Sequence, residues 1–262
     1  MDLGIKGKVA VVLAASKGIG RGCAEALAEE GVKLAVCARD ASTLKTAADA
    51  LRKKADLFEK TCDVTDEAST RAFLEAVRAR FGRIDILINN CGGPVSGGFK
   101  ETMERDKWLQ AFERSLYQVV RWTQAVAPEM AQRKWGRIVN VVSTSVKQPI
   151  DGLLLSNSVR PGVLGFTRSV SRELAPSNVT INCVLPGFTL SDRTRELSQD
   201  RSKAEGISAD EWIRRRAADI PAGRLGSPRE IGDAAAFLCS ERAAYITGVA
   251  LAVDGGGLRA LP

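Results

Sequence analysis

Short apolar runs alternate along the chain with longer segments whose apolar residues recur at helical spacing. The runs are continuous rather than alternating, which predicts strands that are buried on both faces. Six runs have this character: residues 9–15, 34–38, 84–90, 137–142, 179–185 and 249–253. Residues 57–64 give a weaker strand prediction.

The segments between these runs predict helices. They cover approximately residues 18–30, 41–54, 66–81, 104–133, 158–175, 192–217 and 228–240. The last helix has a clear start, because Ser227, Pro228 and Glu230 supply a capping serine, a proline at the first position and a glutamate at the third. The strand–helix alternation predicts an α/β fold: a Rossmann-type, doubly wound parallel sheet with helices on both faces. Without a repeat or linker, residues 1–262 are expected to form a single domain.

One polar, irregular stretch, residues 188–222, follows a predicted strand end. Ligand sites of α/β proteins lie at such ends. We therefore expect this stretch, called the flap below, to cover the substrate side of a site. A plain surface insertion is the alternative.

Composition narrows the possible chemistry. The chain has no histidine, and its six cysteines form no CxxC pair, which argues against a zinc site and against a Ser-His or Cys-His couple. The cysteines lie mostly in apolar runs, as expected of a reduced cytoplasmic protein. No run approaches the roughly 18 apolar residues of a membrane span. The net charge of +7 is spread along the chain, so it indicates solvated helix faces or acidic ligands rather than nucleic acid.

The turn after the first predicted strand has the composition of a phosphate-binding loop. It comprises Ala15, Ser16, Lys17, Gly18, Ile19 and Gly20, and a predicted helix follows. Glycines let the backbone approach a pyrophosphate, and the helix N-terminus offers free N–H groups and the positive end of a dipole. This placement, in the first strand-to-helix turn, predicts dinucleotide binding.

The end of the second predicted strand carries Arg39 rather than an acidic residue. An acid there would bind the ribose 2′-hydroxyl of NAD, whereas an arginine accommodates a 2′-phosphate. Lys17 supplies a second cation facing the same region. The pair predicts NADP(H) in preference to NAD(H). Two ordinary surface cations are the alternative.

The chain resembles the short-chain dehydrogenase/reductase superfamily, most closely the 3-oxoacyl-carrier-protein reductase type. The resemblance spans nearly the whole chain and rests on SKGIG (16–20), CDVTD (62–66), NNCGG (89–93), GRIVNVVS (136–143), INCVLPGF (181–188), GRLGSPREIGDAAAFLCS (223–240) and YITGVALAVDGG (245–256). It implies a homo-tetramer or homo-dimer and a small-molecule or acyl-carrier-linked substrate. It also implies cofactor contacts to the adenine, the ribose and the nicotinamide, from Asp63, Val64, Asn90, Gly92, Pro186 and Gly187.

The catalytic positions depart from the family pattern. Ser143 matches the family serine, but Ser156 stands at the tyrosine position and Arg160 at the lysine position, where we expect it to serve both catalysis and cofactor binding. Ser115 occupies the asparagine position. The phosphate loop opens with Leu13 and Ala14 where the family has Thr-Gly.

These departures leave several readings open. In the first, the chain is an NADP(H)-dependent reductase of 3-oxoacyl-thioester-like carbonyls, in which Arg160 stabilises the developing oxyanion and Ser143 or Ser156 relays a proton from water. In the second, it binds cofactor without reductase activity, as a sensor or partner subunit. In the third, only a scaffold or nucleic-acid binder remains. Residues 156–158 are also good helix caps, so a helix could simply begin there.

Overall fold

Seven parallel strands form one sheet in the computed structural model, which describes residues 1–260. The strand order is β3-β2-β1-β4-β5-β6-β7. The strands are β1 (Val9–Val12), β2 (Lys33–Ala38), β3 (Leu57–Thr61), β4 (Ile86–Asn89), β5 (Gly136–Val141), β6 (Val179–Pro186) and β7 (Ala250–Val253). Strands β2 and β3 are added on one side of β1, whereas β4 to β7 are added on its other side, so the strand order reverses between β1 and β4. A crevice opens at such a switch point beyond the carboxyl ends of the strands.

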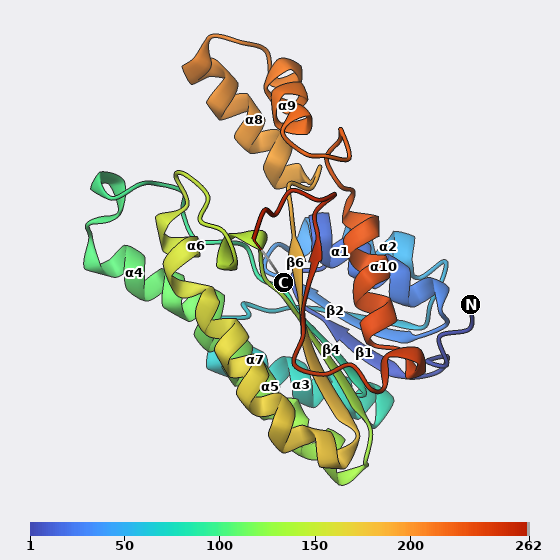
Figure 1. The fold of residues 1–262 in the computed structure, drawn as a ribbon. Helices are drawn as coiled ribbons and strands as arrows, with labels where there is room; N and C mark the ends of the chain where they lie inside the picture. The colour runs from blue at the N-terminus through green and yellow to red at the C-terminus, as the bar shows by residue number, and fades with distance from the viewer. Residues whose placement is uncertain (261–262) are drawn as a thin grey trace.

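Helices cover both faces of the sheet (Figure 1). One face carries α1 (Gly18–Glu29), α2 (Ala41–Leu51) and α10 (Pro228–Leu238), and the other carries α3 (Glu67–Phe81), α5 (Gln118–Gln132) and α7 (Pro161–Leu174). Strand β1 shows the cause, because Ala10 and Val12 belong to the first apolar layer while Val9 and Val11 belong to the second. Successive side chains point to opposite faces, so a continuous apolar run serves two layers at once. The predicted fold class is confirmed.

Strand β7 differs from its prediction. Residues 249–253 were expected to be buried on both faces, but Val249 and Leu251 are more than a third exposed and Tyr245 is fully exposed. The reason is position, because β7 is the last strand of the sheet and pairs only with β6. An apolar edge strand of this kind is a surface that proteins usually cover.

The predicted helix over 104–133 is interrupted. It consists of α4 (Arg105–Phe112), a π-helical turn (Glu113–Tyr117) and α5. Such turns insert an extra residue into the helical ladder and occur often at functional sites. Ser115 lies inside this one.

The predicted helix over 158–175 is likewise two helices, α6 (Leu154–Val159) and α7. Pro161 separates them, because it has no N–H group to continue the first helix and a backbone angle suited to starting the second. The hypothesis that a helix begins at residues 156–158 is wrong, because α6 begins two residues before Ser156.

The flap contains two helices, α8 (Asp192–Glu205) and α9 (Ala209–Ala218), which project from the carboxyl end of the sheet (Figure 1). Its downstream end joins α10 through the predicted capping box, which is confirmed: Ser227 Oγ accepts from the Glu230 N–H at 3.2 Å, and the Glu230 carboxylate accepts from the Ser227 N–H at 2.8 Å. No helix within residues 1–260 is both long enough and apolar enough to span a bilayer.

Helices α1 and α10 touch backbone to backbone. A Cβ atom placed on Gly22 would lie 2.2 Å from the carbonyl oxygen of Pro228, and one on Gly232 would lie 2.2 Å from the carbonyl oxygen of Gly22. No side chain fits at either position. The helix that follows the phosphate loop is therefore packed directly on the helix that follows the flap.

Candidate functional site

The predicted phosphate loop is held between the ends of β2 and β4. The Ala15 N–H donates to the Cys37 carbonyl at 2.9 Å, and the Leu13 N–H donates to the Ile88 carbonyl at 3.2 Å. Asn90 closes the loop from the side, because its amide nitrogen donates to the Leu13 carbonyl at 3.3 Å. Helix α1 then begins at Gly18, and Lys17 makes no side-chain capping bond within the described chain. The first N–H groups of α1 thus face the crevice ready for an anion.

The shape of the loop explains why Gly20 is glycine. A Cβ atom there would lie 2.4 Å from the Ala14 carbonyl oxygen and 2.6 Å from the Asn90 amide nitrogen. Ala14 itself adopts a left-handed backbone conformation, with φ of 50°. That conformation costs an L-residue roughly 1–2 kcal/mol, a cost that glycine does not carry.

Replacing Ala14 with glycine is therefore expected to raise the free energy of unfolding by about 0.5–1 kcal/mol, after allowing for glycine's freedom in the unfolded chain. Urea unfolding measures this change. Ala15→Gly is the matched control and should lower stability, because Ala15 is buried and does not have a positive φ. Equal losses in both variants would contradict strain at Ala14.

The two cations assigned to the 2′-phosphate are Arg39, after β2, and Lys17, before α1. Arg39 follows the strand and is exposed. The pKa of Asp40 is lowered to about 2, chiefly by the hydrogen bond from the Thr43 N–H and in smaller part by the charge of Lys17, so Lys17 lies near the same corner. The Asp40 carboxylate caps α2 by accepting from Thr43 N–H at 2.8 Å and Ser42 Oγ at 2.9 Å. The Asp40 carboxylate is thus occupied in capping the helix, while the Arg39 side chain is exposed to solvent.

Asp63 lies beside this corner with a third cation that the sequence did not indicate. Its carboxylate accepts from the Thr65 N–H at 3.0 Å and the Thr65 hydroxyl at 2.7 Å. Partial burial works to raise the pKa of Asp63, but these hydrogen bonds and the charges of Arg39 and Arg114 outweigh it and hold the pKa below its usual value. Arg114 reaches this place from the π-helical turn, a position that only the tertiary fold determines.

The other predicted cofactor residues border the same crevice. Val64 is buried, and its carbonyl accepts from the Trp122 indole N–H at 3.0 Å. Gly92 is exposed just beyond β4, and Pro186 ends β6. At Gly187 a Cβ atom would lie 2.6 Å from the Asp254 Cβ, so the backbone passes close to the segment after β7.

Two of the predicted catalytic residues line one small cavity, called the inner cavity below. Its lining is Asn89, Cys91, Arg114, Ser115, Gln118, Val119, Val141, Val142, Arg160 and Val163. Arg160 donates from Nη1 to the Val142 carbonyl at 2.5 Å. The buried Ser115 hydroxyl has no hydrogen-bond partner among the described residues. Burial raises the pKa of the Cys91 thiol despite the nearby arginine charges, so Cys91 is a thiol rather than a thiolate nucleophile.

The other two catalytic candidates belong to a row of serines. Ser143 Oγ accepts from the Ser145 N–H at 3.1 Å, and Ser145 Oγ lies 3.0 Å from Ser156 Oγ. Ser156 is buried and is absent from the described lining of both pockets in this region. None of these groups is an acid with a pKa near neutrality. Proton delivery through this row therefore depends on hydroxyl relay rather than on a titrating side chain.

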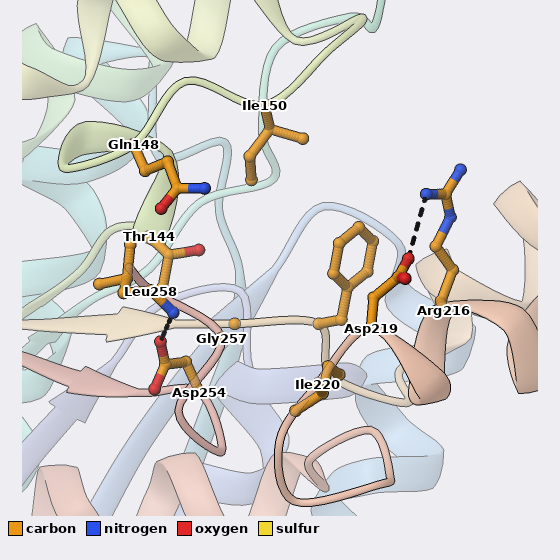
Figure 2. A pocket seen from close by; sticks show the side chains of 11 residues that line it. Thr144, Gln148, Ile150, Arg216, Asp219, Ile220, Asp254, Gly257 and Leu258 are labelled. Atoms are coloured by element: carbon orange, nitrogen blue, oxygen red, sulfur yellow. Dashed lines mark hydrogen bonds and ion pairs between the residues drawn. The ribbon is translucent and has the colours of Figure 1, made fainter. Parts of the chain in front are cut away.

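A second and larger pocket, the outer pocket, includes Thr144, the residue after Ser143, and residues of the flap (Figure 2). It has a volume of about 140 Å³ and is lined by Thr144, Gln148, Ile150, Gly187, Phe188, Arg216, Asp219, Ile220, Asp254, Gly257 and Leu258. Four of these residues lie within 188–222, so the flap contributes to the lining of this pocket. The sequence did not indicate the contributions of Gln148, Ile150 and the segment after β7. Among residues 1–260, no group of three or more cysteines and carboxylates is arranged to hold a metal ion.

Known proteins share this sequence and architecture. The family described as Enoyl-(Acyl carrier protein) reductase matches residues 13–257. The 3-oxoacyl-[acyl-carrier-protein] reductase FabG of Vibrio cholerae is 38% identical over 254 residues, covering 97% of this chain and 98% of that protein. L-sorbose reductase from Gluconobacter frateurii, solved with NADPH and L-sorbose, superposes over the full length of both chains with a TM-score of 0.95 and 33% identity. An actinorhodin polyketide ketoreductase variant solved with NADPH superposes with a TM-score of 0.91 and is 34% identical, covering 96% of this chain and 97% of that chain.

Proposed function

The chain belongs to the short-chain dehydrogenase/reductase family, and from that premise we propose that it is an NADP(H)-dependent oxidoreductase of carbonyl or hydroxyl substrates. The observation that carries the cofactor assignment is the corner after β2. There the exposed Arg39 and the nearby Lys17 place two positive charges, while the neighbouring Asp40 carboxylate is taken up in capping α2. The positive charge suits the 2′-phosphate of NADP(H). The 2′-hydroxyl of NAD(H) would need an acidic acceptor at this position, where the chain has Arg39 instead.

The residues of the crevice fit a dinucleotide. The Ala15–Gly20 loop leaves a cradle that a single Cβ at Gly20 would fill, and the N-terminus of α1 would hold the pyrophosphate. Asp63 would accept a hydrogen bond from the adenine, with Arg114 beside it. Asn90, Gly92, Pro186 and Gly187 would border the ribose and nicotinamide. When bound, the cofactor would supply a hydride.

The chain's own residues then handle charge and proton. Arg160 places a permanent positive charge in the inner cavity, and its guanidinium keeps its proton at any physiological pH. It therefore acts by electrostatic stabilisation of a developing oxyanion and not as an acid. Ser143, next to the outer pocket, is the hydroxyl best placed to pass a proton from water. The relatives make 3-oxoacyl thioesters the first substrate class to examine.

Two measurements on the purified protein test this proposal. We expect NADPH to bind at least tenfold more tightly than NADH, and NADPH to be oxidised slowly when a 3-oxoacyl thioester or a simple ketone is added. Nicotinamide fluorescence and absorbance at 340 nm are the readouts. A folded protein that binds neither dinucleotide would overturn the proposal.

The alternative function is cofactor binding without reductase activity, as in a sensor or a partner subunit. The observation that favours it is the burial of Ser156 against Ser145. The Ser156 hydroxyl is therefore absent from the described lining of the pocket and does not face a substrate there. Tight NADPH binding with no oxidation, across both ketones and thioesters, would select this alternative.

We also propose that the chain forms a homo-dimer or homo-tetramer. Two apolar surfaces support this. One lies on α4 and the π-helical turn and includes Leu109, Phe112 and Tyr117, with Phe112 and Tyr117 stacked on each other. The other is the edge of β7, with Val249 and Leu251 exposed. Covering an apolar edge strand prevents uncontrolled pairing.

A further inference from the structure

We propose that the outer pocket receives a compact, uncharged substrate body about the size of a six-membered carbon ring, and that Leu258 sets this size limit. The inference rests on the proposed function, because the pocket adjoins Ser143 through Thr144 and the proposed nicotinamide border through Gly187. It goes further by stating which carbonyl compounds the site accepts.

Size is the first argument. The pocket measures about 140 Å³. An apolar cavity of about 150 Å³ is known to hold one benzene molecule, so the volume matches a single ring. The Arg216 and Asp219 side chains of the lining are 42% and 76% exposed, so the pocket is open to solvent on their side. The methylenes of a straight chain longer than about six carbons would therefore remain in water.

The lining is the second argument. Its apolar surface comes from Ile150, Phe188, Ile220 and Leu258, which belong to four separate segments of the chain. Figure 2 shows Ile150, Ile220 and Leu258 around the pocket. Hydrophobic and aromatic walls with few polar groups are typical of sites for small apolar molecules.

The charged groups of the pocket are already engaged with other groups. The Asp254 carboxylate accepts from the Gly256 N–H at 3.1 Å and from the Leu258 N–H at 2.7 Å. Arg216 lies 4.0 Å from Asp219 in the ion pair drawn in Figure 2. A charged substrate body would enter this pocket without a free counter-ion, and burying an unpaired charge is costly.

Leu258 is held in place from both sides. Its own N–H is fixed by Asp254, and the next residue, Arg259, donates its N–H to Gln148 Oε1 at 3.0 Å. The segment after β7 is thereby fastened to the segment after β5, and Leu258 closes the pocket between them. Because this wall belongs to a short terminal segment and not to the sheet, its side chain can be shortened without disturbing the core.

The test is a substrate series at saturating NADPH. Wild-type protein should show the highest kcat/KM for cyclohexanone among cyclohexanone, 1-tetralone and 4-oxocyclohexanecarboxylate, with at least a tenfold penalty for the carboxylate. Along the 2-ketones from butanone to 2-decanone, kcat/KM should stop rising at about six carbons. Each buried methylene is worth about 0.8 kcal/mol, or roughly fourfold, so an unbroken fourfold rise per carbon to 2-decanone would overturn the size limit.

Leu258→Ala should raise kcat/KM for 1-tetralone about tenfold relative to cyclohexanone. Leu3→Ala is the matched control, because it removes the same atoms from a partly buried leucine that packs on the core beside the sheet. It should leave the ratio unchanged. A uniform change for all substrates in Leu258→Ala would overturn the role of this residue.

Ligand binding separates this inference from the proposed function. Calorimetry on the NADPH-saturated protein measures ring and chain ketones without turnover. Ring-selective binding with no NADPH oxidation would support the pocket assignment and reject the reductase. Turnover of long-chain ketones, with cyclohexanone neither bound nor reduced, would reject the pocket assignment and leave the reductase intact.

Discussion

Arg39→Leu is expected to weaken NADPH binding by about 10–100-fold while leaving NADH binding within about twofold of wild type. The two cofactors differ only in the 2′-phosphate, and hydrogen bonds to a charged group contribute roughly 1.5–3 kcal/mol. Arg39 follows β2 directly. Of the two acids near it, Asp40 is fixed as the cap of α2 and Asp63 accepts hydrogen bonds from Thr65. No side chain is therefore in place to favour NADH once the guanidinium is removed.

Fluorescence titration at low and high salt measures this effect. Wild-type NADPH affinity should fall as salt rises, and Arg39→Leu should flatten that dependence. Arg71→Leu is the control, because Arg71 is an exposed arginine on α3 whose ion pair is with Glu67 four residues away. Equal weakening of NADPH and NADH in Arg39→Leu would show that Arg39 supports the loop rather than the phosphate.

The double variant S156Y/R160K is expected to raise carbonyl reductase activity by about 10²–10⁴-fold. Residues 156 and 160 lie one helical turn apart, and the Arg160 N–H donates to the Ser156 carbonyl at 3.2 Å, so the two side chains share a face of α6. A phenol next to an ammonium is a usable general acid, whereas a serine hydroxyl next to a guanidinium is not. Stopped-flow or steady-state NADPH oxidation measures the gain.

The pH profile distinguishes a restored acid from a merely better-shaped pocket. A phenol donates its proton only below its pKa, so reduction by the double variant should decline as pH rises through that value. Wild type has no such group in the site, and its rate should lack this alkaline limb. Each single variant should remain slow. A folded double variant that binds NADPH yet gains nothing would contradict the alignment of Ser156 with the family tyrosine.

Local signals made most of the fold predictable. Continuous apolar runs located six of the seven strands because a parallel strand buried by helices is apolar on both sides, as Val11 and Val12 of β1 illustrate. The edge strand β3 is mixed in composition and was predicted only weakly. The start of α10 was visible because a capping box is contained in four residues. The exposure of β7 was not predictable, because the sequence around Leu251 does not show whether its strand lies at the centre or at the edge of a sheet. The π-helical turn around Ser115 was not predictable either, because one extra residue in a helix does not visibly change the spacing of its apolar residues.

The residues of the candidate site also fall into those that the local sequence predicts and those that only the tertiary fold brings together. The phosphate loop and Arg39 were predictable because each lies next to the strand that positions it. Arg114 and Leu258 were not, because they meet the site from segments far from it in sequence. The contact between Ser145 and Ser156 is also a product of tertiary packing. Because of this contact, proton delivery in the absence of the family tyrosine would have to involve a hydrogen-bonded row of hydroxyl groups.

The glycine contact between α1 and α10 has a consequence for the order of events during turnover. Gly22 and Gly232 leave no side-chain layer between the helices, so neither can shift without the other. Helix α1 begins at the phosphate loop, and α10 carries the downstream end of the flap. A pyrophosphate bound to the first N–H groups of α1 would thus act on a helix that is in direct contact with the helix following the flap. We therefore expect dinucleotide binding at α1 to influence the placement of the flap, which would favour cofactor binding before substrate.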